Sequence, residues 1–183
     1  TDPEWAGRVG AAPGNASFQA FVTGFRTAEG DDAARAWLED MAANDPQTFE
    51  GNGDVLEALE SGVIDIGLIN HYYVFKLAAE VGSDNVVTEL QFPEAGDPGA
   101  LVNVTGAAAL SDHPDAQAFI SYLVSEEGQQ YFADTTFEYP LVPGIAAPDG
   151  LPELTSIKGP VADLSDLADV GTSITMIEEA GLS

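Results

Sequence analysis

Two adjacent tyrosines, Tyr72 and Tyr73, are the side chains of this sequence whose types and spacing most clearly suit a chemical task. They follow an apolar run that begins at Val63, and a chain that bends there from a strand into a helix can turn both phenols toward one ligand. Phenolate is a hard anionic oxygen donor, which suits a hard trivalent cation such as ferric iron. Tyrosine is also a common packing residue whose hydroxyl forms one hydrogen bond. The pair alone leaves both uses open.

Small polar residues stand where predicted helices begin. Asn15, Ala16 and Ser17 follow a Pro-Gly turn, so free backbone N–H groups, the Ser17 hydroxyl and the Asn15 amide could converge on a small oxyanion. Asn52 and Asn70 stand at comparable corners between strand and helix. Ordinary helix capping explains each of these residues singly. The pattern therefore predicts either an anion pocket or a set of separate caps.

Other kinds of chemistry find little support. His71 and His113 lie far apart and lack the spacing of a zinc site, although His71 directly precedes the tyrosine pair. His113, next to Pro114, is expected to be a solvated residue near a helix cap. The chain has no cysteine, which excludes disulfides, thiolate metal sites and thiol catalysis. No nucleophile elbow or phosphate-binding loop is present, and nothing in the sequence marks an enzyme.

The charge of the chain is extreme. Five basic residues against 31 acidic ones give a net charge of −26 over 183 residues. The acidic residues are spread among apolar positions, which disfavours a disordered acidic tail. Such a surface repels itself unless concentrated salt screens it, with a Debye length of about 3 Å at 1 M. The composition predicts an extremely halophilic source and excludes nucleic acid and anionic membrane surfaces as direct partners.

Predicted strands and helices alternate along the chain, which is typical of an α/β lobe, here with a mixed sheet. Strands are predicted at residues 8–12, 63–69, 86–92, 100–104 and 107–110. Helices are predicted after Asn15, after Gly30, after Asp54, at 72–81, after Pro114, at 126–133 and at 173–180. The proline-rich stretch 138–160 predicts an extended connector. A long extended run near 104–106 is expected to cross from one lobe to another.

Four sequence blocks, separated by the same spacings as in a known family, carry a resemblance over most of the chain. They are Ala12–Gln19, Gly67–Tyr73, Asp97–Val102 continuing through Gly106–Ala108, and Glu138–Leu141. Together they resemble the periplasmic ferric-ion-binding proteins of ABC importers. Members of that family are two-lobed, class II solute-binding proteins that close on ferric iron held between the lobes. The resemblance implies an α/β, periplasmic-binding-protein-like lobe with a mixed sheet flanked by helices.

The resemblance also implies a site. Tyr72 and Tyr73 would ligate ferric iron, and Asn15, Ala16 and Ser17 would hold a synergistic anion, phosphate or carbonate. Asn52 and Asn70 would assist in holding the anion, and His71 is a possible accessory that either assists or interferes. The family usually takes further ligands, such as a His and a Glu, from a first lobe that would precede Thr1. Some relatives place a third tyrosine where this chain has Ser17, so the sequence favours the anion-assisted variety.

The same resemblance implies a division of the chain. Residues 1–105 would form the second lobe, 106–152 would return to the first lobe, and 153–183 would pack back on the second as a C-terminal helical segment. The full-length protein would be extracytoplasmic, anchored at the cell surface, and would deliver iron to an ABC permease. Without the first lobe, an apolar face would lose its partner, so this segment is expected to pack on itself, swing away or self-associate. That face comprises Phe119, Ile120, Leu123 and Phe132.

Three alternatives stay open at this point. A solute-binding protein for another small ligand, such as an organic anion, thiamine or a polyamine, would use the tyrosines for stacking or hydrogen bonding. A hydrolase would keep its turnover when both tyrosines are removed. A surface interaction module would have a tight protein partner and no ligand. A charge-transfer colour with ferric iron separates the first of these from an iron-binding protein.

Overall fold

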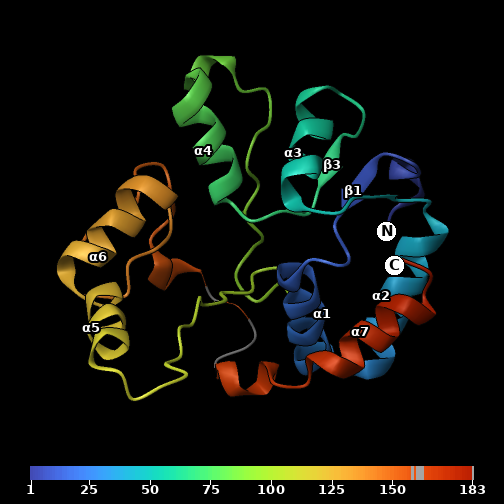
Figure 1. Cartoon of the computed structure of the whole chain (residues 1–183). Coiled ribbons are helices and arrows are strands. Elements are labelled where there is room, and N and C mark those ends of the chain that lie inside the picture. The colour runs from blue at the N-terminus through green and yellow to red at the C-terminus, as the bar shows by residue number, and fades with distance from the viewer. Residues whose placement is uncertain (158, 160–162, 183) are drawn as a thin grey trace. The chain divides into compact units, whose positions relative to one another are not determined.

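The chain folds around a small parallel sheet. The computed structural model describes residues 1–157, 159 and 163–182, so the predicted end of the extended connector at Pro160 lies outside the described residues. Strands β1 (Val9–Ala11), β2 (Gln47–Thr48) and β3 (Ile66–Gly67) lie in the order β2-β1-β3, with both pairs parallel. Figure 1 labels β1 and β3. Gly10, in the central strand, packs against the side chains of Ile64 and Phe49, so an added Cβ would force them to shift.

Helices connect these strands and form the core with them. They are α1 (Ala16–Glu29), α2 (Asp31–Ala43), α3 (Asn52–Glu60), α4 (Tyr72–Val81) and, near the C-terminus, α7 (Val170–Glu179). α1, α2 and α7 pack side by side (Figure 1) and bury Val22, Leu38 and Ile177 against β1. α3 contributes Val55 and other apolar residues to a second cluster. The predicted α/β class is therefore confirmed, as are the predicted helices in this part of the chain.

The chain divides into two compact units. One comprises Thr1–Asn103 with Lys158–Ser183, of which the structure describes 159 and 163–182 after the gap, and the other comprises Val104–Ile157. The second unit contains α5 (Pro114–Leu123), α6 (Glu126–Tyr131) and a π-helical turn at Phe132–Thr136. Short 3₁₀ helices lie at Pro3–Trp5, Ser83–Asn85, Leu154–Ser156 and Leu164–Leu167. In the described residues, no helix has the length and apolarity needed to cross a bilayer.

Apolar side chains lie on the surface of the unit Val104–Ile157. Phe119 is 61% exposed, whereas Ile120, Leu123 and Phe132 are half-buried. Further exposed apolar or aromatic residues of this unit are Val104, Leu110, Tyr122, Val124, Tyr131 and Leu141. Exposed groups of this kind are typical of surfaces that bind another protein segment. The predicted self-association, and the assignment of this unit to a first lobe, stay predictions.

The predicted mixed sheet is wrong for the described residues, because the segments at 86–92, 100–104 and 107–110 are not paired as strands. The Glu60 carboxylate accepts the backbone N–H groups of Val87 and Thr88, at 3.0 and 2.7 Å for its closest oxygens, so a side chain takes donors that a neighbouring strand would need. Ala100 donates its N–H to Asp97 O and thus closes a turn. Strand propensity reflects packing on a half-buried surface, and these segments lack that surface here.

The predicted strand at 63–69 is shorter than expected. Val63 donates its backbone N–H to Ala58 O, so it still belongs to the turn that ends α3, and its side chain is 56% exposed. Bonding to the β1 segment begins where the N–H groups of Asp65 and Ile66 donate to Arg8 O, and it continues where Leu68 donates to Gly10 O. The carboxyl end of β3 nevertheless points the chain directly toward α4 and its two tyrosines.

Glu60 holds its segment as an ionised group. Partial burial raises its pKa, but hydrogen bonds from Thr88 and Val87 outweigh this, and the net pKa lies below the usual value for a glutamate. A carboxyl group with a lowered pKa stabilises the fold above its unfolded pKa, and this contribution is lost as the pH falls through the folded value. The contact between α3 and residues 87–88 is therefore present at neutral pH.

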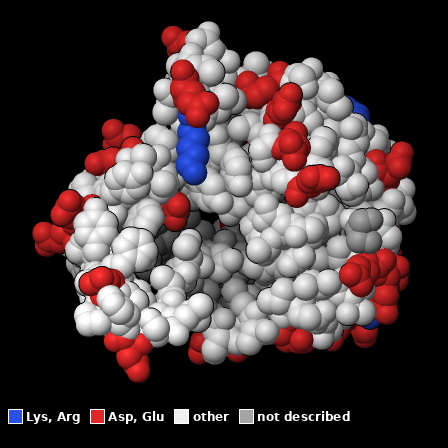
Figure 2. Space-filling view, in the orientation of Figure 1, with Lys and Arg blue, Asp and Glu red and all other residues white. Residues whose placement is uncertain are grey.

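The basic residues that the structure describes are all engaged within the chain. Arg8 pairs with Asp65 and covers the Trp5 ring, and Arg35 pairs with Glu179. Figure 2 shows acidic side chains spread over the visible face, with very few basic ones among them. Because 31 acidic residues face five basic ones, most carboxylates of this surface have only solvent cations to balance them.

Arg26 ties three elements together. Its side chain is only 9% exposed, and it donates to Asp31 Oδ1 at 2.9 Å, to Asp169 Oδ2 at 3.1 Å and to Ser173 Oγ at 3.1 Å. Desolvation lowers the pKa of Arg26, but hydrogen bonds and charges of Asp31 and Asp169 more than compensate, so the net pKa is raised. α1, the start of α2 and the start of α7 therefore meet on one guanidinium group.

Replacing Arg26 with methionine is expected to lower the free energy of unfolding by about 1–3 kcal/mol, because several hydrogen bonds are lost while their carboxylate partners stay largely hydrated. Urea unfolding in concentrated KCl measures the change. Arg35→Met is the matched control, because Arg35 pairs with one acidic side chain at the surface, where its own side chain is 45% exposed. Equal stability of the two variants would contradict the role assigned to Arg26.

Candidate metal and anion centre

The candidate site lies at the carboxyl edge of the parallel sheet. β1 leads into α1, β2 into α3 and β3 into α4, so the N-termini of three helices follow the same ends of three parallel strands. Ligands of open α/β sheets bind at this edge, where loops converge and helix N-termini offer free N–H groups. The topology thus gathers the polar residues that the sequence places at three separate corners.

Four of these residues form one hydrogen-bonded cluster, here called the asparagine cluster: Asn15, Ser17, Asn52 and Asn70. Asn15 Oδ1 accepts both the backbone N–H and the hydroxyl of Ser17, each at 2.9 Å. The Asn52 amide donates to Ser17 Oγ at 3.2 Å and to Asn70 Oδ1 at 2.7 Å. Asn52 is 2% exposed. The structure therefore brings together candidate residues that lie up to 55 positions apart, from Asn15 to Asn70.

Asn15 also has the ordinary role of a helix cap. It is the N-cap of α1, and its side chain accepts from the second residue of the helix, Ser17. Ala16 is the first residue of α1 and is exposed. Capping and anion binding are compatible, because an N-cap satisfies one backbone donor of the first turn and leaves others for a ligand.

The tyrosine pair opens α4. The ring centroids of Tyr72 and Tyr73 lie 4.8 Å apart with an angle of 27° between the ring planes, and both side chains are half-buried. Asn70 joins this pair to the asparagine cluster, because its main-chain oxygen accepts the N–H of Tyr73 at 3.3 Å while its side chain bonds Asn52. The two tyrosines therefore begin their helix at the same edge of the sheet as the anion candidates.

Two neighbours shape the surroundings of Tyr72. The His71 ring lies edge-on to Tyr72, with centroids 5.7 Å apart, and edge-on to Phe75 at 6.3 Å. Lys76 Nζ lies 4.9 Å from the centroid of the Tyr72 ring, in cation–π geometry. Sequence reasoning missed Lys76, although its position four residues after Tyr72 in a predicted helix could have indicated the contact. A cation and a helix N-terminus both favour negative charge here.

The remaining candidate, His113, is the N-cap of α5, where its Nδ1 accepts the N–H of Asp115 at 3.3 Å; this confirms the expected capping-region position. Within the described ranges, no three His, Asp or Glu side chains gather as a metal site. The roles of Tyr72, Tyr73 and the asparagine cluster rest on the placement described above and stay proposals.

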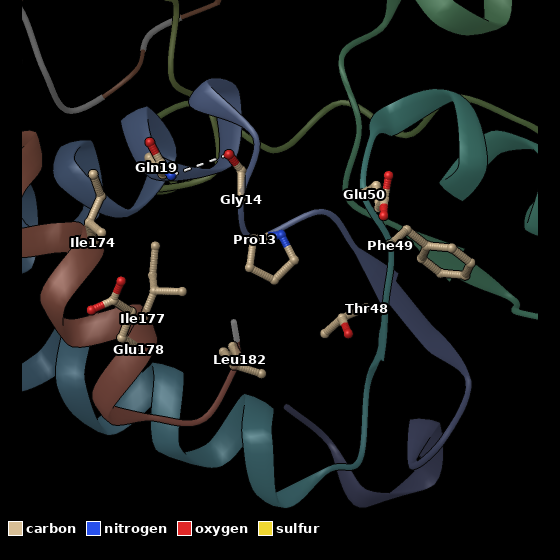
Figure 3. A pocket seen from close by; sticks show the side chains of 10 residues that line it. All are labelled: Pro13, Gly14, Gln19, Thr48, Phe49, Glu50, Ile174, Ile177, Glu178 and Leu182. Carbon is tan, nitrogen blue, oxygen red and sulfur yellow. Dashed lines mark hydrogen bonds between the residues drawn. The ribbon is translucent and has the colours of Figure 1, made fainter.

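A separate hollow of about 380 Å³ lies beside the Pro13–Gly14 turn (Figure 3). Pro13, Ile177 and Leu182 give it an apolar lining, and Gln19 donates to Gly14 O at 3.3 Å across its rim. None of the tyrosine or asparagine candidates lines this hollow. This hollow and the predicted site are therefore different places in the fold.

A comparison with known families decides the class of the chain. The family described as bacterial extracellular solute-binding protein matches residues 1–158. This chain belongs to the bacterial extracellular solute-binding proteins. Membership confirms the expectation that this solute-binding protein is not an enzyme.

The relatives share one kind of name. The "Major ferric iron-binding protein" of Neisseria meningitidis serogroup B is 33% identical over 98% of this chain and 55% of its own length. The "Fe(3+)-binding periplasmic protein" of Serratia marcescens is 34% identical over 98% of this chain and 54% of its own length. The chain thus spans about half the length of these curated relatives.

Solved structures agree with the sequence relatives. Iron-bound HitA from Pseudomonas aeruginosa superposes with a TM-score of 0.90 at 33% identity, over 98% of this chain and 59% of that one. Apo FutA2 from Synechocystis gives a TM-score of 0.78 at 29% identity, over 100% of this chain and 62% of that one. These matches confirm the resemblance to periplasmic ferric-ion-binding proteins and the periplasmic-binding-protein-like fold.

Proposed function

We propose that this solute-binding protein binds ferric iron through the phenolates of Tyr72 and Tyr73, with phosphate or carbonate held beside the metal. One observation carries the proposal: Asn70 links the tyrosine pair to the asparagine cluster through its main chain and its side chain. The relatives reported above are named as ferric iron-binding proteins, which supports the choice of metal.

The chemistry of the residues fits this cargo. A trivalent cation at bonding distance favours the phenolate form strongly, so iron displaces the phenol protons when it binds. Asn15, Ala16 and Ser17 offer a helix N-terminus, an amide and a hydroxyl to the anion, with Asn52 and Asn70 behind them. These donors are neutral, so the anion keeps its charge for the metal.

The wider assembly belongs to the same proposal. Residues 1–105 and 153–183 form the second lobe, and 106–152 returns to a first lobe that supplies further iron ligands. The packing of α7 on α1 and α2 supports the return of the C-terminal segment. The whole protein works outside the cytoplasm, anchored at the cell surface, and delivers iron to an ABC permease.

A titration with ferric nitrilotriacetate in concentrated KCl tests the function. With phosphate or carbonate present, we expect a visible phenolate-to-iron charge-transfer band. The iron concentration that gives half of the full band should rise as the pH is lowered from 8 to 5, because protons compete with iron for the phenolate oxygens. A band that appears only when the proposed first lobe is joined to this chain would assign the limiting ligands to that lobe. No band in either protein would overturn the proposal.

A second ligand class has a specific observation in its favour. The stacked rings of Tyr72 and Tyr73, flanked by the His71 ring, also suit a flat organic ligand such as thiamine. Such a ligand would quench tyrosine fluorescence without any visible band. The colour of the iron complex therefore separates the two functions.

A further inference from the structure

The hollow beside the Pro13–Gly14 turn has the size of a small-molecule site. Its volume is about 380 Å³, and pockets that bind small molecules have volumes of about 300–1,000 Å³. It lies within one compact unit of the chain, where β2, the turn before α1, and α7 with the segment after it all contribute. No residue of the proposed iron and anion site lines the hollow, so the function proposed above does not use it.

One wall of the hollow is apolar and belongs to the core. Ile177 and Leu182 are each 3% exposed, and both are members of the core cluster that α7 shares with α1, α2 and β1. Ile174, one turn earlier on α7, also lines the hollow. Figure 3 shows Ile177 and Leu182 on one side of the Pro13 ring and Thr48 on the other. Close-packed core residues hold such a wall in place, and a slim alkyl chain against it is removed from water.

The border of the hollow carries negative charge and no positive charge. Glu50 and Glu178 are exposed carboxylates on this border, and none of the ten described residues that line the hollow is basic. Glu178 lies in the last turn of α7, where the helix dipole is also negative and where no basic residue stands. Arg35 pairs with the next residue, Glu179, but does not line the hollow. The hollow therefore disfavours an anion and favours a cation.

We propose that this hollow binds an alkylammonium ion, a small organic cation whose head lies near Glu50 and Glu178 and whose chain contacts Ile177 and Leu182. The apolar wall favours this class over potassium, because a hydrated inorganic ion buries no apolar surface. The carboxylates favour it over fatty anions and over neutral alcohols of the same length. Neither surface alone specifies the ligand class, whereas the two together do.

Methyl nuclear magnetic resonance in concentrated KCl tests the site, with hexylammonium chloride as the probe. The methyl signals of Ile177 and Leu182 are expected to shift, whereas those of Val55, in the second core cluster, are expected to stay. Butylammonium should bind about tenfold more weakly, because each buried CH₂ contributes a factor of about three to four. Hexanoate should leave these signals unmoved. Tyr72→Phe should bind hexylammonium as the wild type does, because Tyr72 does not line the hollow.

Two sets of variants separate the role of the charged head from that of the chain. Replacing Glu50 and Glu178 together with glutamine should weaken hexylammonium binding about fivefold and leave 1-hexanol binding unchanged, because exposed ion pairs are individually weak. The matched control replaces Glu80 and Asp84, two exposed carboxylates that do not line the hollow, with their amides and should keep the wild-type affinity. Thr48→Phe should fill the hollow and abolish the shifts, whereas the smaller change Thr48→Val should preserve them.

The outcomes are distinct. Equal affinity for hexylammonium and 1-hexanol in the wild type, or an unchanged affinity in the variant of Glu50 and Glu178, would overturn the choice of a cation. Hexanoate binding of similar strength would overturn it as well. Unmoved methyl signals with hexylammonium, or shifts that persist in Thr48→Phe, would overturn the site itself. The ferric titration is independent of all these results, so the proposed function stands or fails separately.

Discussion

Replacing Tyr72 or Tyr73 with phenylalanine is expected to lower the ferric affinity of this protein by at least about 100-fold and to remove most of the visible charge-transfer absorption. Phenylalanine keeps the ring and its stacking, 4.8 Å from its neighbour, but removes the phenolate oxygen. Loss of an outer-shell partner already costs about 10–100-fold in metal affinity, so loss of a direct ligand costs at least the upper part of that range. Competition against nitrilotriacetate measures the affinity, and the visible spectrum reports the bond.

Tyr131→Phe is the control for this experiment. Tyr131 is 55% exposed, lies at the end of α6, and belongs to the unit Val104–Ile157. The Tyr131→Phe variant should bind iron with the affinity and the visible absorption of the wild type. If Tyr72→Phe and Tyr73→Phe both bind within threefold of the wild type, the phenols do not ligate the metal, and the stacking of an organic ligand becomes the better explanation of the pair.

The helices of this fold could be predicted because their signals are local. α4 covers residues 72–81 as expected, since its apolar residues repeat at helical spacing and Gly82, with φ of 89°, ends it. α1 begins after Asn15, whose side chain supplies the predicted cap. Such signals lie within one turn of the chain and need no knowledge of distant residues.

The strands were harder to predict because a segment forms a strand only when a second segment pairs with it. β2, at Gln47–Thr48, has no alternating apolar pattern, and it exists because Gln47 and Thr48 pair with Gly10 and Ala11 of β1. Conversely, residues 86–92 have strand-forming composition, but Glu60 takes two of their backbone donors. Pairing of this kind depends on residues far away in the sequence, which composition does not reveal.

The residues of the candidate site could be predicted from the sequence, but the hydrogen bonds between them could not. Asn15, Ser17, Asn52 and Asn70 each read as a cap, and only the parallel sheet shows that their side chains share hydrogen bonds. The central place of Asn52 follows from both of its donors being used within the cluster. No sequence pattern specifies which of four polar residues occupies the buried middle.

Lowering KCl from 3 M to 0.1 M is expected to reduce the melting temperature of this protein by more than about 10 °C. The net charge is −26, and the Debye length grows from below about 3 Å to about 10 Å over this change, so repulsion between neighbouring carboxylates is no longer screened. A domain of this size loses about 2–4 °C for each kcal/mol, so a repulsion of several kcal/mol gives the stated shift. Circular dichroism melts across a KCl series measure it.

The control for this experiment removes charge and leaves the fold alone. Five exposed acidic residues that lie outside the ion pairs described above are replaced with the corresponding amides: Asp40, Glu80, Asp84, Glu89 and Asp112. The variant should melt higher than the wild type at 0.1 M KCl and should show a flatter dependence on salt. An identical salt dependence in both proteins would show that bulk exclusion of the salt, rather than screening, stabilises the fold.

The negative charge of the protein surface also acts on the proposed anion pocket. Phosphate must approach a strongly negative protein to reach neutral donors at Ser17 and Asn15, so its binding should weaken as salt is lowered, at concentrations where the chain is still folded. In the five-amide variant this loss should be smaller, although none of the replaced residues belongs to the asparagine cluster. Phosphate binding that is independent of salt would contradict this and would place the anion where the surface charge does not reach. In that case concentrated salt would stabilise the fold and have no effect on phosphate binding. In the proposed arrangement, concentrated salt both stabilises the fold and strengthens phosphate binding.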